Sequence, residues 1–202
     1  MKKLKKANKQ NTQELKFSLI TLVFVVFCSF LLVIATFTQL KIYFPTINKL
    51  EIINYIPQIP TVLFIAGLLG KRYGTLSVLI YVFTGLFLAP VFALGGGLDY
   101  ILNFNFGYIL GFIFATIFAA KIIETKITIL KTILASITGV LTIHITGIIY
   151  LTIILLIEHS SIQNILSWIT NQSINTILID ITFGLGAFAL GNLLKLTIKK
   201  IA

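Results

Sequence analysis

Long apolar runs, separated by short polar or glycine-containing segments, dominate the pattern of residues along this chain. A membrane-spanning helix needs roughly 20 predominantly apolar residues, and six runs reach or approach that length. The sequence therefore predicts the fold class as all-α, an integral membrane protein with six transmembrane helices. These runs cover residues 17–38, 52–70, 74–89, 107–120, 132–157 and 174–194.

Proline residues set the expected limits of two of these helices. Pro57 and Pro60 lie early in the second run, so its helix is expected to start at or after Pro57 and to be short. Pro90 is expected to end the third helix. Residues 39–56 are amphipathic and are expected to lie in the membrane interface.

Composition agrees with a membrane protein. Hydrophobic residues make up 57% of the chain and charged residues 11%, whereas soluble domains average about 25% charged residues. The mean hydropathy of +1.02 leaves too little polar surface to cover a water-soluble globule. We therefore expect the lipid bilayer as its surroundings and a multi-pass location, in a bacterial plasma membrane or a plastid membrane.

Charge orients the predicted helices. The formal net charge is +10, and the cations form short clusters between the apolar runs instead of one solvated basic face, so no nucleic-acid partner is expected. With both termini cytoplasmic, only Lys41 and Lys49 of the 16 Lys and Arg residues lie on outer segments. This orientation predicts basic cytoplasmic tails at residues 1–16 and 198–202 around a membrane domain at 17–197.

Signatures of catalysis are missing from the sequence. It has no P-loop, H-E-x-x-H or G-x-S-x-G motif, and Cys28 is its single cysteine, which excludes a cysteine-pair metal site. We predict no catalytic residue, no metal and no cofactor. If the function of the protein requires ATP hydrolysis, a partner protein must supply it.

Two ionisable residues lie well inside predicted spans, where each costs about 2.5–3.5 kcal/mol on insertion scales. They are His144 and Asp180. One interpretation makes them a ligand-binding pair, or the reactive groups of a membrane enzyme. The other makes His144 a neutral imidazole bonded to Thr142 or Thr146, and Asp180 a partly hydrated carboxylate near the outer boundary.

A Pro-then-Gly break between the third and fourth runs is the second candidate site. Irregular backbone at such a position survives in a membrane protein where it is buried in protein or lines a cavity, but a plain surface hairpin is the alternative. Gln58 offers a carboxamide at the outer end of the second span. Two aromatic residues, Phe92 and Tyr108, are candidates for the wall of a pocket. The remaining candidates are three glycines whose N–H groups could hold a carboxylate, namely Gly95, Gly96 and Gly97.

Three motifs occur in order along the chain, at residues 66–74 (AGLLGKRYG), 90–97 (PVFALGGG) and 106–112 (FGYILGF). Together they resemble the BioY family, the biotin-binding S components of energy-coupling-factor vitamin transporters. Residues 143–147 (IHITG) are similar to the I-H-x-x-G of a cyanobacterial branch of that family.

The resemblance implies biotin as ligand, captured at the outer face of a six-helix bundle. As partners it implies a transmembrane coupling subunit and two ATPase subunits. It assigns Gln58, Gly95–Gly97 and Tyr108 to the ligand site. Many members carry P-G-D-x-x-K in the last span, where this chain has LIDITF at residues 178–183, which retains Asp180 alone. A different small vitamin-like ligand on the same scaffold is therefore the alternative.

Overall fold

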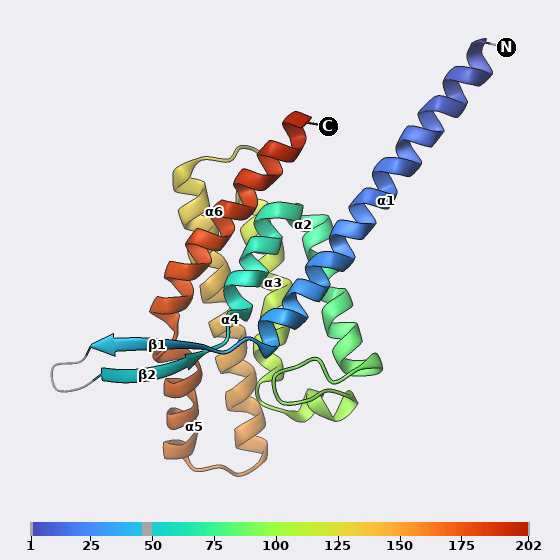
Figure 1. The fold of residues 1–202 in the computed structure, drawn as a ribbon. Coiled ribbons are helices and arrows are strands. Elements are labelled where there is room, and N and C mark those ends of the chain that lie inside the picture. Colours follow the sequence, from blue (N-terminus) through green and yellow to red (C-terminus); the bar gives the residue numbers. More distant parts are fainter. Residues whose placement is uncertain (1, 46–49, 202) are drawn as a thin grey trace.

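The computed structural model of the protein describes residues 2–45 and 50–201, with side chains described at 19–42, 54–198 and 200. The described chain is mostly helical (Figure 1). Its elements in order are α1 (Lys2–Phe37), β1 (Leu40–Pro45), β2 (Leu50–Tyr55), α2 (Gln58–Phe83), the π-helical turn η1 (Thr84–Leu88), the 3₁₀ turn η2 (Leu98–Leu102), α3 (Phe106–Ile122), α4 (Ile129–Ile157), α5 (Ile162–Ile169), the π-helical turn η3 (Thr170–Ile174) and α6 (Ile177–Ile201).

Four helical stretches of the described residues are long and apolar enough to cross a membrane. They are Leu19–Phe37, Gln58–Leu88, Ile129–Ile157 and Ile162–Ile198. The helix Phe106–Ile122 is apolar but shorter. The predicted tails are helical in their described parts, because α1 already begins at Lys2 and α6 continues to Ile201.

Helix α2 is broken where the sequence predicted the boundary between two helices. Gly70 has φ +72° and ψ −171°, a backbone conformation that glycine adopts without steric cost. Lys71 and Arg72 follow in exposed positions, and the second arm turns back beside the first (Figure 1). Pro57 precedes the first arm and η1 ends just before Pro90, so both expected limits are confirmed.

The segment between α1 and α2 corrects the all-α prediction. Strands β1 and β2 pair antiparallel, from Leu40 opposite Tyr55 to Pro45 opposite Leu50. Leu40, Ile42 and Phe44 alternate with Lys41 and Tyr43, and a period of two with β-branched and aromatic residues favours a strand. The amphipathic interface segment is therefore a two-stranded ribbon.

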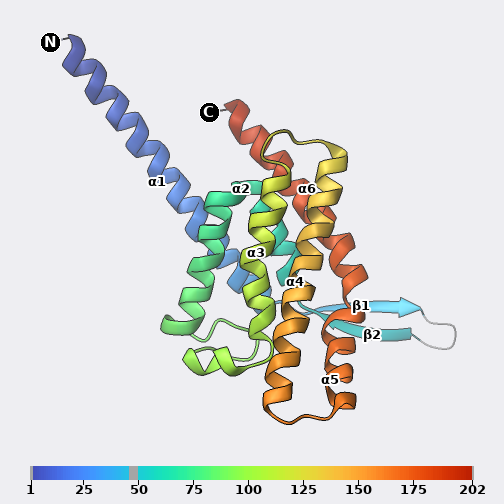
Figure 2. The ribbon, with the colours of Figure 1, turned by 180° about the vertical axis from the view of Figure 1, so that it is seen from behind.

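Close contacts between helices hold the bundle together. Helix α3 packs along α4, α2 packs on α6 and α3, and α1 packs on α2 (Figure 2). Where α2 meets α6, a Cβ atom on Gly191 would lie 2.4 Å from the Phe64 carbonyl oxygen, and one on Gly67 would lie 2.7 Å from that of Phe188. Glycine lets these two backbones approach, as in many membrane helix pairs.

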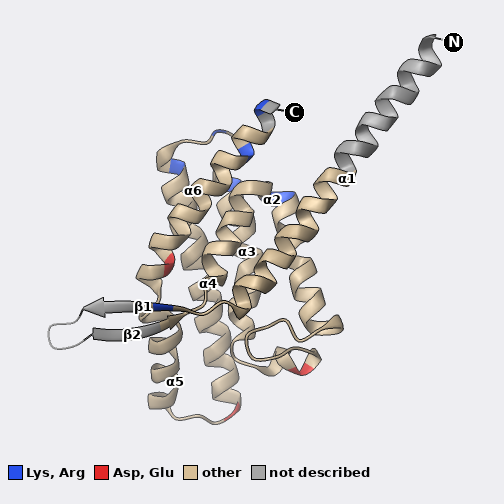
Figure 3. Ribbon diagram, in the orientation of Figure 1, with Lys and Arg blue, Asp and Glu red and all other residues tan. Residues whose placement is uncertain are grey.

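The two ends of the bundle differ in charge. Lys and Arg residues gather mainly at the end where α6 finishes (Figure 3), the end that carries the Gly70 turn and the α3–α4 connection. The opposite end carries the glycine-rich loop of residues 89–97, with Asp99 just after it, and the α4–α5 connection, with Glu158. We call the first the cationic end and the second the loop end.

Candidate ligand-binding site

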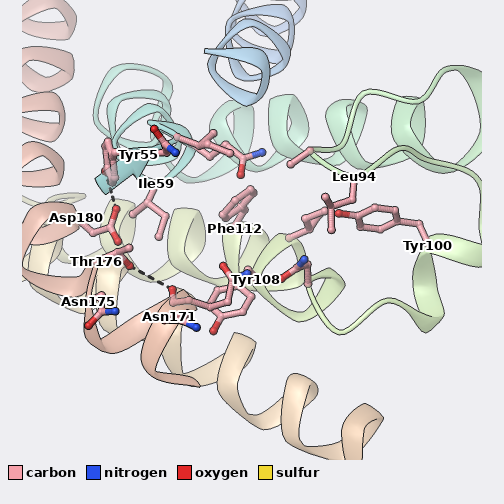
Figure 4. Close-up of a pocket in the computed structure, with 17 residues that line it drawn as sticks. Tyr55, Ile59, Leu94, Tyr100, Tyr108, Phe112, Asn171, Asn175, Thr176 and Asp180 are labelled. Carbon is pink, nitrogen blue, oxygen red and sulfur yellow. Dashed lines mark hydrogen bonds between the residues drawn. The ribbon is translucent and has the colours of Figure 1, made fainter. Parts of the chain in front are cut away.

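A cavity of about 460 Å³ opens at the loop end, between β2, α3 and the start of α6 (Figure 4). Residues from four parts of the chain line it. They are Asn54, Tyr55, Ile56, Gln58 and Ile59 around the start of α2; Ala93, Leu94, Tyr100 and Asn105 in the loop region; Tyr108, Ile109 and Phe112 on α3; and Asn171, Gln172, Asn175, Thr176 and Asp180 on η3, on α6 and in the turn between them.

Asp180 is the carboxylate of this cavity, and it is only 2% exposed. The Tyr55 hydroxyl donates to Asp180 Oδ1 over 2.6 Å, as Figure 4 shows by a dashed line. Burial, and after it the charge and the hydrogen bond of Asp180, raise the pKa of Tyr55, so this phenol remains a donor. On the other side, His144 Nε2 lies 3.2 Å from Asp180 Oδ2.

The network continues from His144 to the opposite wall. His144 Nδ1 lies 3.0 Å from Ser173 Oγ, and Ser173 Oγ lies 2.7 Å from the Tyr108 hydroxyl. One proton arrangement satisfies every member with Asp180 ionised. Tyr108 donates to Ser173, Ser173 donates to His144 Nδ1, and His144 donates through Nε2–H to Asp180. Each carboxylate oxygen of Asp180 then keeps one lone pair free.

Gln58 belongs to a second polar cluster on the far side of the cavity. Its Nε2 donates to Thr36 Oγ1 over 2.8 Å and lies 3.2 Å from the Tyr81 hydroxyl. Thr36 and Tyr81 are buried, whereas Gln58 is half-buried and lines the cavity. Its carboxamide therefore connects the ligand space to α1 and to the second arm of α2.

The glycine-rich loop is folded tightly on itself. Gly95 and Gly97 have φ of +123° and +90°, and their N–H groups donate to the carbonyls of Phe92 and Gly85. Those two N–H groups are thus not available to the ligand carboxylate expected from the sequence. A Cβ on Gly96 would lie 2.6 Å from the Gly85 carbonyl oxygen, which requires glycine there.

Phe92 packs beneath the loop and is not part of the cavity wall. It is 1% exposed, and its ring centroid lies 5.4 Å from that of Tyr81 and 4.7 Å from that of Tyr100. The loop instead contributes Ala93 and Leu94 to the cavity. Phe92 therefore joins the loop to the core.

The structure brings Gln58, Tyr108 and Asp180 of the sequence candidates to one cavity. Phe92, Gly95, Gly96, Gly97 and His144 lie outside its lining. His144 stands behind Asp180, and its hydroxyl partner is Ser173. The sequence proposed Thr142 or Thr146 instead, but these two hydroxyls bond to backbone carbonyls one turn earlier.

Several lining residues were not singled out from the sequence. Tyr55 was hidden in the amphipathic segment, and its role depends on a partner 125 residues away. Asn171, Gln172 and Asn175 form a polar cluster before the last apolar run, and this local composition was the available signal. Their place on the cavity wall depends on the turn η3.

Comparison with known proteins decides the family. Residues 7–200 match the sequence profile of the BioY family. The chain belongs to the BioY family. Its resemblance to that family in three short motifs is confirmed along almost the whole chain.

One curated protein and one solved structure are similar to this chain. A Lysinibacillus sphaericus protein named "Probable biotin transporter BioY" is 36% identical over 95 residues, which cover 46% of this chain and 48% of that protein. The chain thus aligns with about half the length of this relative. A solved structure, the "S-component for biotin from an ECF-type ABC transporter", superposes with a TM-score of 0.60 at 22% identity, over 95% of this chain and 93% of the other. At that identity the likeness establishes the fold.

Proposed function

We propose that this BioY-family chain is the membrane substrate-binding subunit for biotin uptake. It captures biotin at the outer face and delivers it through an ATP-driven coupling module. The observation that carries the proposal is the Asp180 carboxylate, held by Tyr55 and His144 on the wall of a cavity. A buried ionisable group inside a membrane protein marks a functional site.

The chemistry of the cavity suits biotin. The ureido ring of biotin presents two N–H donors, and an ionised Asp180 can only accept hydrogen bonds. Asn171 and Asn175 add carboxamides, while Ile59, Leu94 and Phe112 add apolar surface for the thiophane ring and the aliphatic chain. The volume of about 460 Å³ falls in the range of roughly 300–1,000 Å³ typical of small-molecule sites.

The proposed topology has six crossings, with the two arms of α2 each crossing the membrane and both termini cytoplasmic. The break at Gly70 and the exposed Lys71 and Arg72 beside it support two crossings. Lys71 and Arg72 lie at the same end of the bundle as the α3–α4 connection and the end of α6. This gathering of cations at one end follows the positive-inside pattern. The loop end, with the cavity, then faces outward.

The proposed partners are a transmembrane coupling subunit and two ATPases. The sequence has no P-loop motif, so ATP hydrolysis belongs to partner proteins. Membership in a family of transport proteins argues against the enzyme alternative. So does the position of His144, whose two ring nitrogens already face Asp180 and Ser173.

A second candidate is a different vitamin-like ligand on the same scaffold. The observation that favours it is the absence of Lys and Arg among the described residues that line the cavity. A ligand carboxylate would find no cation on that wall, and a neutral ligand would need none.

Isothermal titration of the detergent-purified protein with biotin, desthiobiotin and thiamine tests both candidates. We expect submicromolar biotin binding at one site, with thiamine silent. Gln163, exposed on α5 and outside the cavity lining, provides the matched control Gln163→Ala for Gln58→Ala. Absence of biotin binding to the folded protein would overturn the biotin assignment. Tight binding of another compound would favour the second candidate.

A further inference from the structure

Three side chains from different segments meet behind the Gln58 wall of the cavity. Thr36 lies in the last turn of α1, Gln58 begins α2, and Tyr81 lies in its second arm. Thr36 Oγ1 and the Tyr81 hydroxyl are 3.0 Å apart, and Gln58 Nε2 lies within 3.2 Å of both. These three polar atoms form a closed triangle.

The direction of these hydrogen bonds follows from the protons available. The Thr36 hydroxyl donates its single proton to the Leu32 carbonyl over 2.9 Å, so toward Gln58 and Tyr81 it can only accept. An amide oxygen placed at 2.8 Å from that Thr36 oxygen would meet lone pairs without a proton between them. The nitrogen of the Gln58 carboxamide must therefore face Thr36.

This orientation leaves Gln58 Oε1 on the opposite arm of the amide. No donor among the described residues bonds to that oxygen, and Gln58 lines the cavity. We propose that Thr36 and Tyr81 are positioning residues that hold Gln58 Oε1 toward the ligand. The wall at Gln58 then accepts a hydrogen bond from a ligand N–H or O–H, and disfavours a ligand carbonyl or carboxylate.

The positioning pair is itself rigidly supported. Tyr81 is fully buried, and its ring meets the Phe92 ring at 68° in an edge contact. The Phe92 ring occupies the space that a side chain at position 85 would need, because a Cβ on Gly85 would lie 2.1 Å from it. The glycine-rich loop thus contacts Gln58 indirectly, through Phe92 and Tyr81.

A double-mutant cycle measured by biotin titration tests the proposal. This experiment rests on the proposed function, because biotin is its ligand. Loss of one neutral hydrogen bond corresponds to roughly 2- to 12-fold in affinity, so Tyr81→Phe and Thr36→Val should each weaken binding by about that factor. In a Gln58→Leu background, the same two substitutions should change affinity less than about 2-fold. Equal losses with and without Gln58 would overturn the positioning role.

Thr38→Val is the matched control, because Thr38 lies two residues beyond Thr36, is half-buried, and its hydroxyl donates to the Ile34 carbonyl. It should leave biotin affinity unchanged. Thermal melting of each variant identifies any that fail to fold. Tyr81→Phe and Thr36→Val each remove, independently, a hydrogen-bond partner of the Gln58 carboxamide.

A ligand-free measurement separates this inference from the biotin assignment. In nitrogen NMR spectra of glutamine-labelled protein, the side-chain NH₂ signal of Gln58, identified by its loss in Gln58→Leu, should exchange slowly with solvent. It should exchange faster in Tyr81→Phe and Thr36→Val. If the Gln58 NH₂ group exchanges slowly in a protein that does not bind biotin, only the biotin assignment is rejected. If its exchange rate is the same in Tyr81→Phe and Thr36→Val as in the parent protein, the positioning role is rejected.

Discussion

The loop end and the cationic end of the bundle both depend on glycine, and they differ in that the cavity opens at the loop end. At the cationic end, Gly67 and Gly191 remove side chains so that α2 and α6 approach until their backbones touch. At the loop end, Gly95 and Gly97 allow the positive-φ backbone of a tight loop, whose Gly97 N–H donates to the Gly85 carbonyl. The first use closes the space between two helices, and the second shapes a loop that contributes Ala93 and Leu94 to the cavity wall.

Both ends contain a helical irregularity, but of different kinds, and at the cationic end it is the break of α2 at Gly70. Both π-helical turns, η1 and η3, stand at the loop end, and such turns are frequent at functional sites. Turn η3 carries Asn171, Gln172 and Ser173 to the cavity and its network. If the proposed function is correct, ligand recognition belongs to the loop end and close helix packing to the cationic end, so we expect substitutions at the two ends to have different consequences.

Gly191→Val should have the largest effect, on folding. Its Cβ would lie 2.4 Å from the Phe64 carbonyl oxygen and 2.9 Å from the Leu68 nitrogen, which are backbone atoms that cannot move aside. Overpacking of this kind costs about 1–3 kcal/mol or more. Thermal melting in detergent should show a strongly lowered midpoint or a loss of monodisperse protein.

Gly186→Ala is the matched control on the same helix. Nothing lies within 4 Å of a Cβ at Gly186, and alanine is favoured over glycine inside a helix by about 1 kcal/mol. Its melting midpoint should stay the same or rise. A Gly191→Val protein as stable as Gly186→Ala would contradict the close-packed account of the cationic end.

Asp180→Asn should have the largest effect on binding. The substitution keeps the shape of the side chain but removes the charge that Tyr55 and His144 hold, and hydrogen bonds to charged groups contribute about 1.5–3 kcal/mol. We expect biotin affinity to fall by roughly 10- to 150-fold by isothermal titration. Unchanged affinity in the folded variant would remove Asp180 from the site.

His144→Phe should have a smaller effect, because His144 lies behind the cavity lining and bonds to Asp180 and Ser173. Phenylalanine keeps the ring but removes both hydrogen bonds of the imidazole. Leaving buried partners unsatisfied costs about 1–3 kcal/mol, so we expect a lower melting midpoint and a biotin affinity reduced by about 10-fold. Thr142→Val, two residues away at a position whose hydroxyl donates to the Thr138 carbonyl, should change neither quantity.

The double variant Lys71→Gln with Arg72→Gln should have the smallest effect on binding. Both residues are exposed beside the Gly70 break, at the end of the bundle opposite the loop end where the cavity opens. Biotin affinity measured by titration should change by less than about 2-fold, within the usual effect of surface substitutions. A larger loss would show that the two ends are coupled and that the division between them fails.

Local residue chemistry was enough to predict much of the fold. Pro57, Gly70 and Pro90 set helix limits through backbone conformation alone, and these limits are observed. The β1–β2 ribbon was not predicted, because its alternation at period two is short and the long apolar runs around it favour helices. The sequence also identified Gln58, Tyr108 and Asp180, which the fold brings to one cavity.

Tertiary contacts decide the remainder of the candidate site. His144 and Asp180 are 36 residues apart in the chain, and Tyr55 and Asp180 are 125 apart. No local pattern states that Ser173 lies between His144 and Tyr108, or that Phe92 supports Tyr81. Such partners depend on how helices cross, which a single sequence does not encode in any short window.

The structure of the protein crystallised with biotin would test the central claim most directly. The account predicts biotin density in the cavity at the loop end, with ureido nitrogen atoms within hydrogen-bond distance of Asp180 and no density at the cationic end. Biotin bound elsewhere on the protein, or an empty cavity at saturating biotin, would contradict it.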